Sequence, residues 1–201
     1  MEHWLDFLFP PRSDEEILRD APLDAFLAKV SPRLIPDTSP ETVGLLPFSA
    51  RSVRAAVHEA KYHGSEHAFG LLAAALAEYL RDADETRMPV IVPVPLGKAR
   101  RKERGFNQTE EIAGRAAREL GLAVDTALLM RTRETASQIP LPRRARLENM
   151  RGAFRAAHPV DPAHTYIVID DVITTGATLQ AAVDALKDAG ALHIVPLALA
   201  R

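Results

Sequence analysis

The sequence predicts an α/β fold in which helices cover both faces of a parallel sheet, with a proline-rich arm at the N-terminus. Largely apolar runs predict strands at Val90–Val94, Tyr166–Ile169 and His193–Ala200, and the second of them is rich in β-branched residues. Such runs are typical of strands that are buried on both faces of a sheet. Amphipathic stretches of helical length alternate with these runs, as in a parallel sheet with helical crossovers.

The first half of the chain predicts an arm followed by two helices. Residues 1–48 hold seven of the fifteen prolines, and helical periodicity there is confined to Asp14–Val30, where a proline interrupts it. Ser49–Lys61 and Glu66–Arg81 both have the spacing of amphipathic helices. We therefore predict that the folded domain spans residues 49–201 and that the arm precedes it.

The second half of the chain alternates strands with helices. Asn107-Gln-Thr-Glu110 has the form of a capping box and predicts a helix that continues to Leu120. Ala127–Met130 predicts the next strand, and Leu179–Ala189 predicts a later helix. Arg131–Asn149 is rich in arginine and proline and has no apolar period. A long irregular segment of this kind is either a functional lid or disordered.

Composition excludes several classes of protein. The chain of 201 residues has no cysteine, which rules out disulfides, thiolate zinc sites and cysteine nucleophiles. No run approaches the roughly 20 apolar residues of a membrane span, and Glu2 stands where a signal peptide carries Lys or Arg. We therefore expect a cytoplasmic protein with no membrane partner.

Charge is distributed unevenly along the chain. The net charge is only −2, but residues 1–48 carry four basic and nine acidic side chains, whereas residues 98–151 carry thirteen basic and seven acidic ones. An anionic ligand requires such a local excess of positive charge.

Two aspartates and a turn of small residues follow the strand at Tyr166–Ile169. Asp170 and Asp171 close the strand, and Thr174–Thr178 opens the next helix. The free N–H groups and the dipole of a helix N-terminus favour an anion, and small residues let the backbone approach it closely. Carboxylates beside that anion can accept hydrogen bonds from hydroxyls. A ligand with a phosphate and a vicinal diol fits both features, so the sequence points to a ribose 5-phosphate.

This stretch resembles the signature of the type I phosphoribosyltransferases, which bind phosphoribosyl pyrophosphate (PRPP). The resemblance implies that the two aspartates hold the ribose hydroxyls and stabilise the positive charge that develops on the ribose, that the turn holds the 5-phosphate, and that Mg²⁺ binds with PRPP. The residues implied to bind PRPP are Asp170, Asp171, Val172, Ile173, Thr174, Thr175, Gly176, Ala177 and Thr178.

Two basic segments are candidates for further ligand contacts. Ligands of a parallel sheet lie beyond the carboxyl ends of its strands, so the loop after Val90–Val94 should reach the same edge as the two aspartates. We interpret Lys98 and Arg104 in that loop as a clamp for the pyrophosphate, with a solvated charged loop as the alternative. Arg131–Arg151 carries six arginines against two acids, which suits a lid over PRPP, a contact to nucleic-acid phosphates or a mobile loop.

Histidines offer a weaker candidate site. His63 and His67 are four residues apart and His58 lies nearby, a spacing that can bind a metal on one helix. Gly64 intervenes and no carboxylate partner is evident. We therefore interpret the three as surface histidines and predict no metal held by protein side chains.

Further strings resemble the ComF family of bacterial competence-associated, phosphoribosyltransferase-like proteins. Their order and spacing from about residue 45 onward make the resemblance specific. The family pattern includes a four-cysteine zinc ribbon near the N-terminus, but residues 12–48 here have no cysteine, so we expect no zinc. The matching strings are Lys61-Tyr-His-Gly64, Pro93-Val-Pro-Leu96, Arg104-Gly-Phe-Asn-Gln108, Thr135-x-x-Gln138, Arg146-x-x-Asn149 and Gly152-Ala-Phe154.

Two functions are compatible with these interpretations. The first is an enzyme that transfers phosphoribosyl from PRPP to an acceptor and releases pyrophosphate. The second is a non-enzymatic protein of competence or DNA uptake that senses PRPP in the same pocket and binds single-stranded DNA on a basic surface. Aromatic residues make up 5% of the chain, so base stacking should contribute little to DNA binding. A homodimer is left open.

Overall fold

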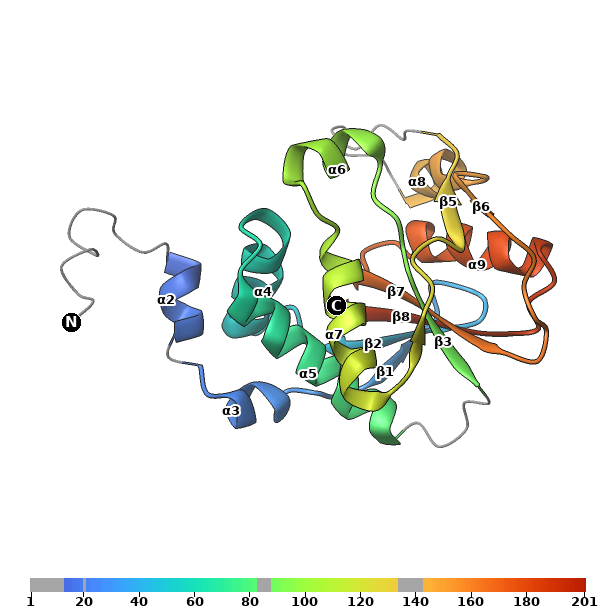
Figure 1. Cartoon of the computed structure of the whole chain (residues 1–201). Coiled ribbons are helices and arrows are strands. Elements are labelled where there is room, and N and C mark those ends of the chain that lie inside the picture. The colour runs from blue at the N-terminus through green and yellow to red at the C-terminus, as the bar shows by residue number, and fades with distance from the viewer. Residues whose placement is uncertain (1–12, 20, 83–87, 134–142) are drawn as a thin grey trace.

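A six-stranded sheet forms the centre of the computed structural model, which describes residues 13–19, 21–82, 88–133 and 143–201 (Figure 1). Neighbouring strands are parallel except for the pair at one edge, β1 with β2. In spatial order the strands are β1 (Arg33–Ile35), β2 (Thr42–Leu46), β8 (His193–Ala200), β7 (Thr165–Val172), β3 (Pro89–Pro93) and β4 (Ala123–Val124). The predicted α/β fold with a parallel sheet is confirmed.

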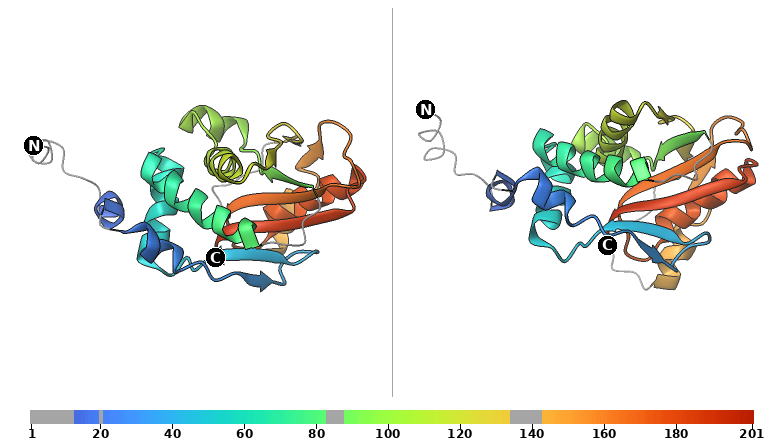
Figure 2. Two further views of the ribbon diagram at one scale, coloured as in Figure 1. Left: turned by 60° about the horizontal axis from the view of Figure 1, so that its bottom comes forward. Right: turned by 90° about the horizontal axis from the view of Figure 1, so that it is seen from below.

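Helices cover both faces of the sheet, as the sequence predicts. In the right-hand view of Figure 2, α5 and α7 lie on one side of the strands, and α8 and α9 lie on the other. Neighbouring residues of a strand point to opposite faces, so Ile91 and Ile167 enter one hydrophobic core and Val92 and Val168 enter the second. The helices around the sheet are α4 (Arg51–Tyr62), α5 (Glu66–Asp82), α7 (Gln108–Leu120), α8 (Arg143–Met150) and α9 (Ala177–Asp188).

The helix after the basic loop begins at the predicted N-cap residue. Asn107 is the N-cap of α7, and its Oδ1 accepts a hydrogen bond from Thr109 N over 3.2 Å. Its Nδ2 donates to Glu110 Oε1 over 3.1 Å. The helix ends at Gly121, which takes the left-handed conformation with φ 69°. The helices α4 and α5 also lie where the amphipathic periodicity predicts them.

The strand predicted at Ala127–Met130 does not join the main sheet, so its predicted position in the fold is wrong. The strand beside β3 is β4, and the later residues form β5 (Leu129–Arg131), which pairs antiparallel with β6 (Phe154–Ala156) in a separate two-stranded sheet. Asp125 causes the departure, because its Oδ1 accepts from the backbone N–H groups of Ala127 and Leu128 and turns the chain. This small sheet packs with α8 and α9.

Part of the predicted arm lies inside the main sheet. Its helical stretch is divided into α2 (Ser13–Arg19) and α3 (Leu23–Leu27), with Pro22 at the N-cap of α3. The strand β2 is buried along its whole length and pairs in parallel with β8. A Cβ at Gly44 would lie 2.7 Å from Ile35 Cδ1, so the glycine leaves room for the Ile35 side chain. The sequence pattern did not predict β2, because the strand is short and has a glycine at its centre.

The basic segment predicted as irregular contains a helix. Its residues 143–150 form α8, whereas residues 134–142 lie outside the described part of the chain. Across the described residues, no helix combines the length and apolar character that crossing a membrane requires.

Candidate functional site

A cavity of about 580 Å³ opens at the carboxyl ends of β3 and β7. The backbone joins the two strands there, since Val94 N donates to Ile169 O over 2.9 Å. The cavity lies between the end of this sheet edge, the helix α4 and the N-terminus of α9. Its lining residues are Phe48, Arg54, Val57, His58, Lys61, Tyr62, Val94, Pro95, Leu96, Arg100, Arg104, Gln108, Thr109, Arg131, Arg146, Asn149, Met150, Asp170, Asp171, Val172, Thr174, Thr175, Ala177 and Thr178.

Asp171 is buried and held by two side chains from other elements. Lys61 Nζ, from α4, lies 2.9 Å from Asp171 Oδ2. Gln108 Nε2, from the first turn of α7, donates to the same oxygen over 2.5 Å. The second oxygen, Oδ1, accepts from Val172 N over 2.6 Å. The carboxylate is therefore fixed in position before any ligand arrives.

The neighbouring Asp170 has a raised pKa. Burial, and then the charge of Asp171, raise the pKa of Asp170 from 3.8 to about 7. A hydrogen bond from Asp171 N over 2.9 Å and the charges of Lys61 and Arg131 act in the opposite direction without cancelling the rise. The side chain keeps some contact with the cavity. Near neutral pH, the Asp170 side chain can therefore bind or release one proton as the charge of a ligand changes.

The turn predicted to hold phosphate forms the next wall of the cavity. Thr174, Thr175, Ala177 and Thr178 line it, whereas Ile173 is buried in the core below. Gly176 is the N-cap of the twelve-residue helix α9, in the left-handed conformation with φ 72°.

The back of this turn packs against residues of the predicted arm. A Cβ at Gly176 would lie 2.9 Å from Thr38 Cγ2 and 3.1 Å from Asp37 O. Next to that contact, Ser39 N donates to Gln180 Oε1 over 2.7 Å, and Lys187 Nζ donates to Ser39 O over 2.7 Å. Residues 37–39 therefore support the turn from behind and leave its other side open to the cavity.

Of the two residues predicted to clamp pyrophosphate, Arg104 lines the cavity and Lys98 does not. Both belong to α6 (Lys98–Arg104), where Lys98 is the first residue and is exposed. Arg104 Nη1 donates to Gln108 Oε1 over 3.1 Å, and its guanidinium lies 5.0 Å from the centre of the Tyr62 ring. Arg100, one turn earlier on α6, is the second residue of this helix to reach the cavity.

Several side chains of the cavity wall had no role in the sequence-based interpretation. Lys61 and Gln108 were visible only as members of short family strings, without a derived role. Arg146 lines the cavity from α8, and its Nη1 lies 3.4 Å from Thr174 Oγ1. Arg131 lines it from β5, with its guanidinium 5.6 Å from the centre of the Phe154 ring. The predicted basic segment thus supplies two of the arginines in the wall.

Comparisons with known proteins place the chain among bacterial relatives, although no family model matches it. It is 37% identical over 149 residues to DNA utilization protein YhgH of Salmonella typhi, covering 72% of this chain and 65% of that protein. It is 33% identical over 128 residues to competence protein F of Haemophilus influenzae, covering 61% and 56%. The chain thus spans somewhat less than two thirds of the length of these relatives.

A solved structure also resembles this chain. It is adenine phosphoribosyltransferase from Leishmania tarentolae, with 17% identity and a TM-score of 0.41, covering 88% of this chain and 72% of that one. The curated relatives give the stronger likeness, at 33–37% identity. Over most of its length, the chain is therefore a homologue of the bacterial proteins named DNA utilization protein YhgH and competence protein F.

Proposed function

We propose that the protein binds PRPP in the cavity at the end of β7 and transfers its phosphoribosyl group to an acceptor, with release of pyrophosphate. One observation carries the proposal: the acidic pair and the turn that opens α9 line the same cavity. Among the described residues that line it, Asp170 and Asp171 are the only carboxylates. The cationic side chains of the lining are Arg54, Lys61, Arg100, Arg104, Arg131 and Arg146. A ligand with several negative charges and one diol matches this distribution.

The 5-phosphate is assigned to the N-terminus of α9. Backbone N–H groups of the first turn of a helix have no partner within the helix, and the dipole favours an anion there. Thr174, Thr175 and Thr178, which carry hydroxyls, line the cavity at this turn. Arg146, close to Thr174, adds a positive charge that suits a phosphate.

The pyrophosphate is assigned to the opposite wall, which α6 and α4 form. Arg100 and Arg104 replace the sequence-based pair of Lys98 and Arg104 in this role, because Lys98 does not reach the cavity. Mg²⁺ prefers oxygen ligands and usually binds through one or two carboxylates and the phosphates of its partner. The carboxylates of Asp170 and Asp171 are the protein oxygens that fit such an ion.

The proposed reaction exchanges one bond at the ribose. The bond from ribose C1 to a pyrophosphate oxygen breaks, and a bond from C1 to the acceptor's nucleophile forms. Positive charge develops on the ribose between these events, and the carboxylates of Asp170 and Asp171 would stabilise it. Fixing Asp171 through Lys61 and Gln108 in advance lowers the reorganisation that the reaction requires.

The test measures pyrophosphate release from PRPP and Mg²⁺ across a panel of purine and pyrimidine bases and primary amines. Release that depends on one acceptor, and that Asp170→Asn with Asp171→Asn abolishes, supports the transferase. Asp188→Asn, on the exposed side of α9, is the matched control because it removes a carboxylate far from the cavity lining. Binding of PRPP without release in any mixture would favour a PRPP sensor.

A second candidate function, binding of single-stranded DNA, rests on the exposed Arg144 of α8. The side chain of Arg144 is 92% exposed, whereas Arg146 on the same helix lines the cavity. Relatives carry the names DNA utilization protein and competence protein. Affinity for a labelled single strand should fall steeply with salt, since phosphate contacts release counterions. PRPP with Mg²⁺ should displace the strand if both need the cavity arginines, and undiminished binding at saturating PRPP would separate the two sites.

A further inference from the structure

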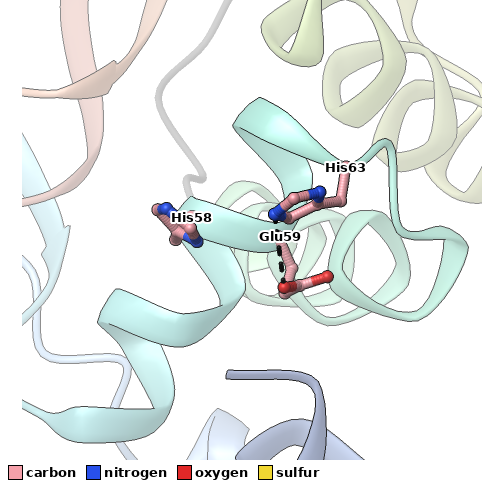
Figure 3. A group of neighbouring side chains, drawn as sticks. All are labelled: His58, Glu59 and His63. Carbon is pink, nitrogen blue, oxygen red and sulfur yellow. Dashed lines mark ion pairs between the residues drawn. The ribbon is translucent and has the colours of Figure 1, made fainter. Parts of the chain in front are cut away.

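The C-terminal end of α4 brings two histidines and a carboxylate together. His58, Glu59 and His63 offer one nitrogen or oxygen each, and these three atoms lie within 4.8 Å of one another. In Figure 3, Glu59 and His63 point toward one another, and His58 lies next to Glu59 on α4, which ends just before His63. His67, which the sequence spacing paired with His63, instead lies with its Nε2 3.1 Å from Leu18 O. The structure therefore selects a different set of side chains from the one the sequence suggested.

We propose that His58, Glu59 and His63 bind a divalent transition metal of the Zn²⁺ class. Two imidazoles and one carboxylate suit Zn²⁺, Co²⁺ or Ni²⁺, whereas Mg²⁺ and Ca²⁺ prefer sites made of oxygen alone. Metal–ligand distances of about 2.1 Å place neighbouring donors of a tetrahedral site about 3.4 Å apart. His63 Nε2 and Glu59 Oε1 are already 3.9 Å apart. Rotation of the exposed His58 side chain is the main adjustment that the site needs.

The backbone fixes His63 over Glu59. The helix ends at Tyr62, and the N–H groups of His63 and Ser65 both donate to Glu59 O, over 3.1 and 3.3 Å. The turn continues through Gly64, with φ 60°, where a Cβ would lie 3.1 Å from the ring of Phe106. Glu59 itself is 1% exposed. Two of the three ligands are therefore held in place without the metal, which reduces the conformational entropy that binding must overcome.

A second carboxylate orients the third ligand. Asp14 Oδ2, from α2, lies 3.1 Å from His58 Nδ1. Histidines that bind metals commonly give one ring nitrogen to a carboxylate, which fixes the direction of the ring. The absence of a carboxylate partner was the sequence-based reason to predict no metal here, and the structure supplies two, Asp14 and Glu59. The nearest cation on the helix, Lys61, is paired with Asp171.

The proposed ion would lie at the edge of the PRPP cavity, because His58 also lines that cavity. Three protein ligands leave a position of a four-coordinate ion open, as in catalytic rather than structural zinc sites. An anionic ligand in the cavity could fill that position with an oxygen. The proposal does not depend on PRPP binding, and its test needs no PRPP.

The test uses untagged, metal-free full-length protein. Calorimetry with ZnCl₂ is expected to give one ion per chain, and CoCl₂ is expected to give the visible absorption bands of four-coordinate Co²⁺. His58→Ala and His63→Ala should each weaken Zn²⁺ binding by at least about tenfold, and Asp14→Asn by about tenfold through the orientation of His58. Glu59→Gln should do the same, with its melting temperature measured alongside because the side chain is buried.

The matched control is His158→Ala. His158 Nε2 pairs with Asp125 Oδ2 over 3.0 Å, and its side chain is 48% exposed, as is that of His58. Unchanged Zn²⁺ affinity in His158→Ala, with a loss in both His58→Ala and His63→Ala, supports the site. Absence of Zn²⁺ binding by the unaltered protein would overturn the proposal. So would full affinity in His58→Ala or His63→Ala, or an equal loss in the control.

Discussion

Lys61 Nζ lies 2.9 Å from Asp171 Oδ2, which joins the last turn of α4 to the acidic end of β7. The two residues are 110 positions apart in the sequence, and their side chains are 24% and 12% exposed. Water therefore screens this ion pair only partly. The contact gives a physical role to a string that the sequence showed only as a family resemblance. Lys61 holds Asp171 in place and adds positive charge to the cavity.

Replacing Lys61 by a residue of similar length should remove its ion pair and its charge while keeping most of its packing. Lys61→Met keeps the length of the side chain but leaves Asp171 with Gln108 as its side-chain partner. We expect the free energy of unfolding to fall by about 1–3 kcal/mol and PRPP affinity to fall by about tenfold or more. Urea denaturation and calorimetry measure the two effects. Lys102→Met, at an exposed position of α6, should change neither.

The pKa of Asp170 should produce a pH dependence of stability in the ligand-free protein. Its folded pKa of about 7 lies above the ordinary 3.8, so the folded state holds a proton that the unfolded chain releases. Stability linked to this proton is complete below about pH 4 and is lost as pH rises toward 7. Asp170→Asn should flatten that decline and melt higher than the unaltered protein at pH 8. A melting curve that falls equally between pH 4 and 7 in both proteins would contradict the assignment.

Asp171→Asn should behave in the opposite way. The charge that it removes is paired with Lys61, so we expect the free energy of unfolding to fall by about 1–3 kcal/mol at pH 8. From sequence alone, the two aspartates are equivalent, and removing both charges should be neutral or mildly stabilising. The structure distinguishes the two residues. The charge of Asp170 is destabilised by burial and by Asp171, whereas the charge of Asp171 is paired with Lys61. Equal melting temperatures for the two single variants at pH 8 would argue against this division.

Gly176 should tolerate substitution less well than another glycine with a similar backbone conformation. The sequence suggests that a side chain here would fill the phosphate site and leave the fold intact. The structure corrects this, because the Cβ would meet Asp37 and Thr38 behind the turn. Gly176→Ala should therefore both destabilise the protein and weaken PRPP binding.

The matched control is Gly105→Ala, at φ 80° with no atom within 4 Å of the added Cβ. This substitution should lower the free energy of unfolding only by the cost of a left-handed backbone conformation in alanine, about 1–2 kcal/mol. Gly176→Ala should cost more than this, and the difference measures the close approach of residues 37–38. If both variants lose the same stability, the contact with the arm contributes nothing.

The sequence predicted those parts of the site whose residues lie close together along the chain. Asp170, Asp171 and Thr174–Thr178 occupy one strand, one turn and one helix start, so their relative positions follow from secondary structure. The strand Val90–Val94 could be placed beside them because parallel strands share an edge for their ligands. The capping box at Asn107 is likewise local.

The parts that the sequence did not predict depend on tertiary contacts. Helical spacing shows that Lys61 lies on α4 but not which element that side of the helix faces. Asp125 turns the chain off the sheet through two backbone hydrogen bonds, which a strand pattern cannot reveal. The strand β2 is five residues long and pairs with β8 from the other end of the chain. The contact of Asp14 with His58 likewise joins separate helices.

Calorimetric titration of PRPP in the presence of Mg²⁺ tests the central claim most directly. We expect one PRPP per chain, no comparable heat without Mg²⁺, and loss of binding when Asp170→Asn and Asp171→Asn are combined. The same titration with Asp188→Asn should match the unaltered protein. Absence of binding by PRPP, by ribose 5-phosphate and by a nucleoside monophosphate, in protein shown to be folded, would contradict the assignment of this cavity.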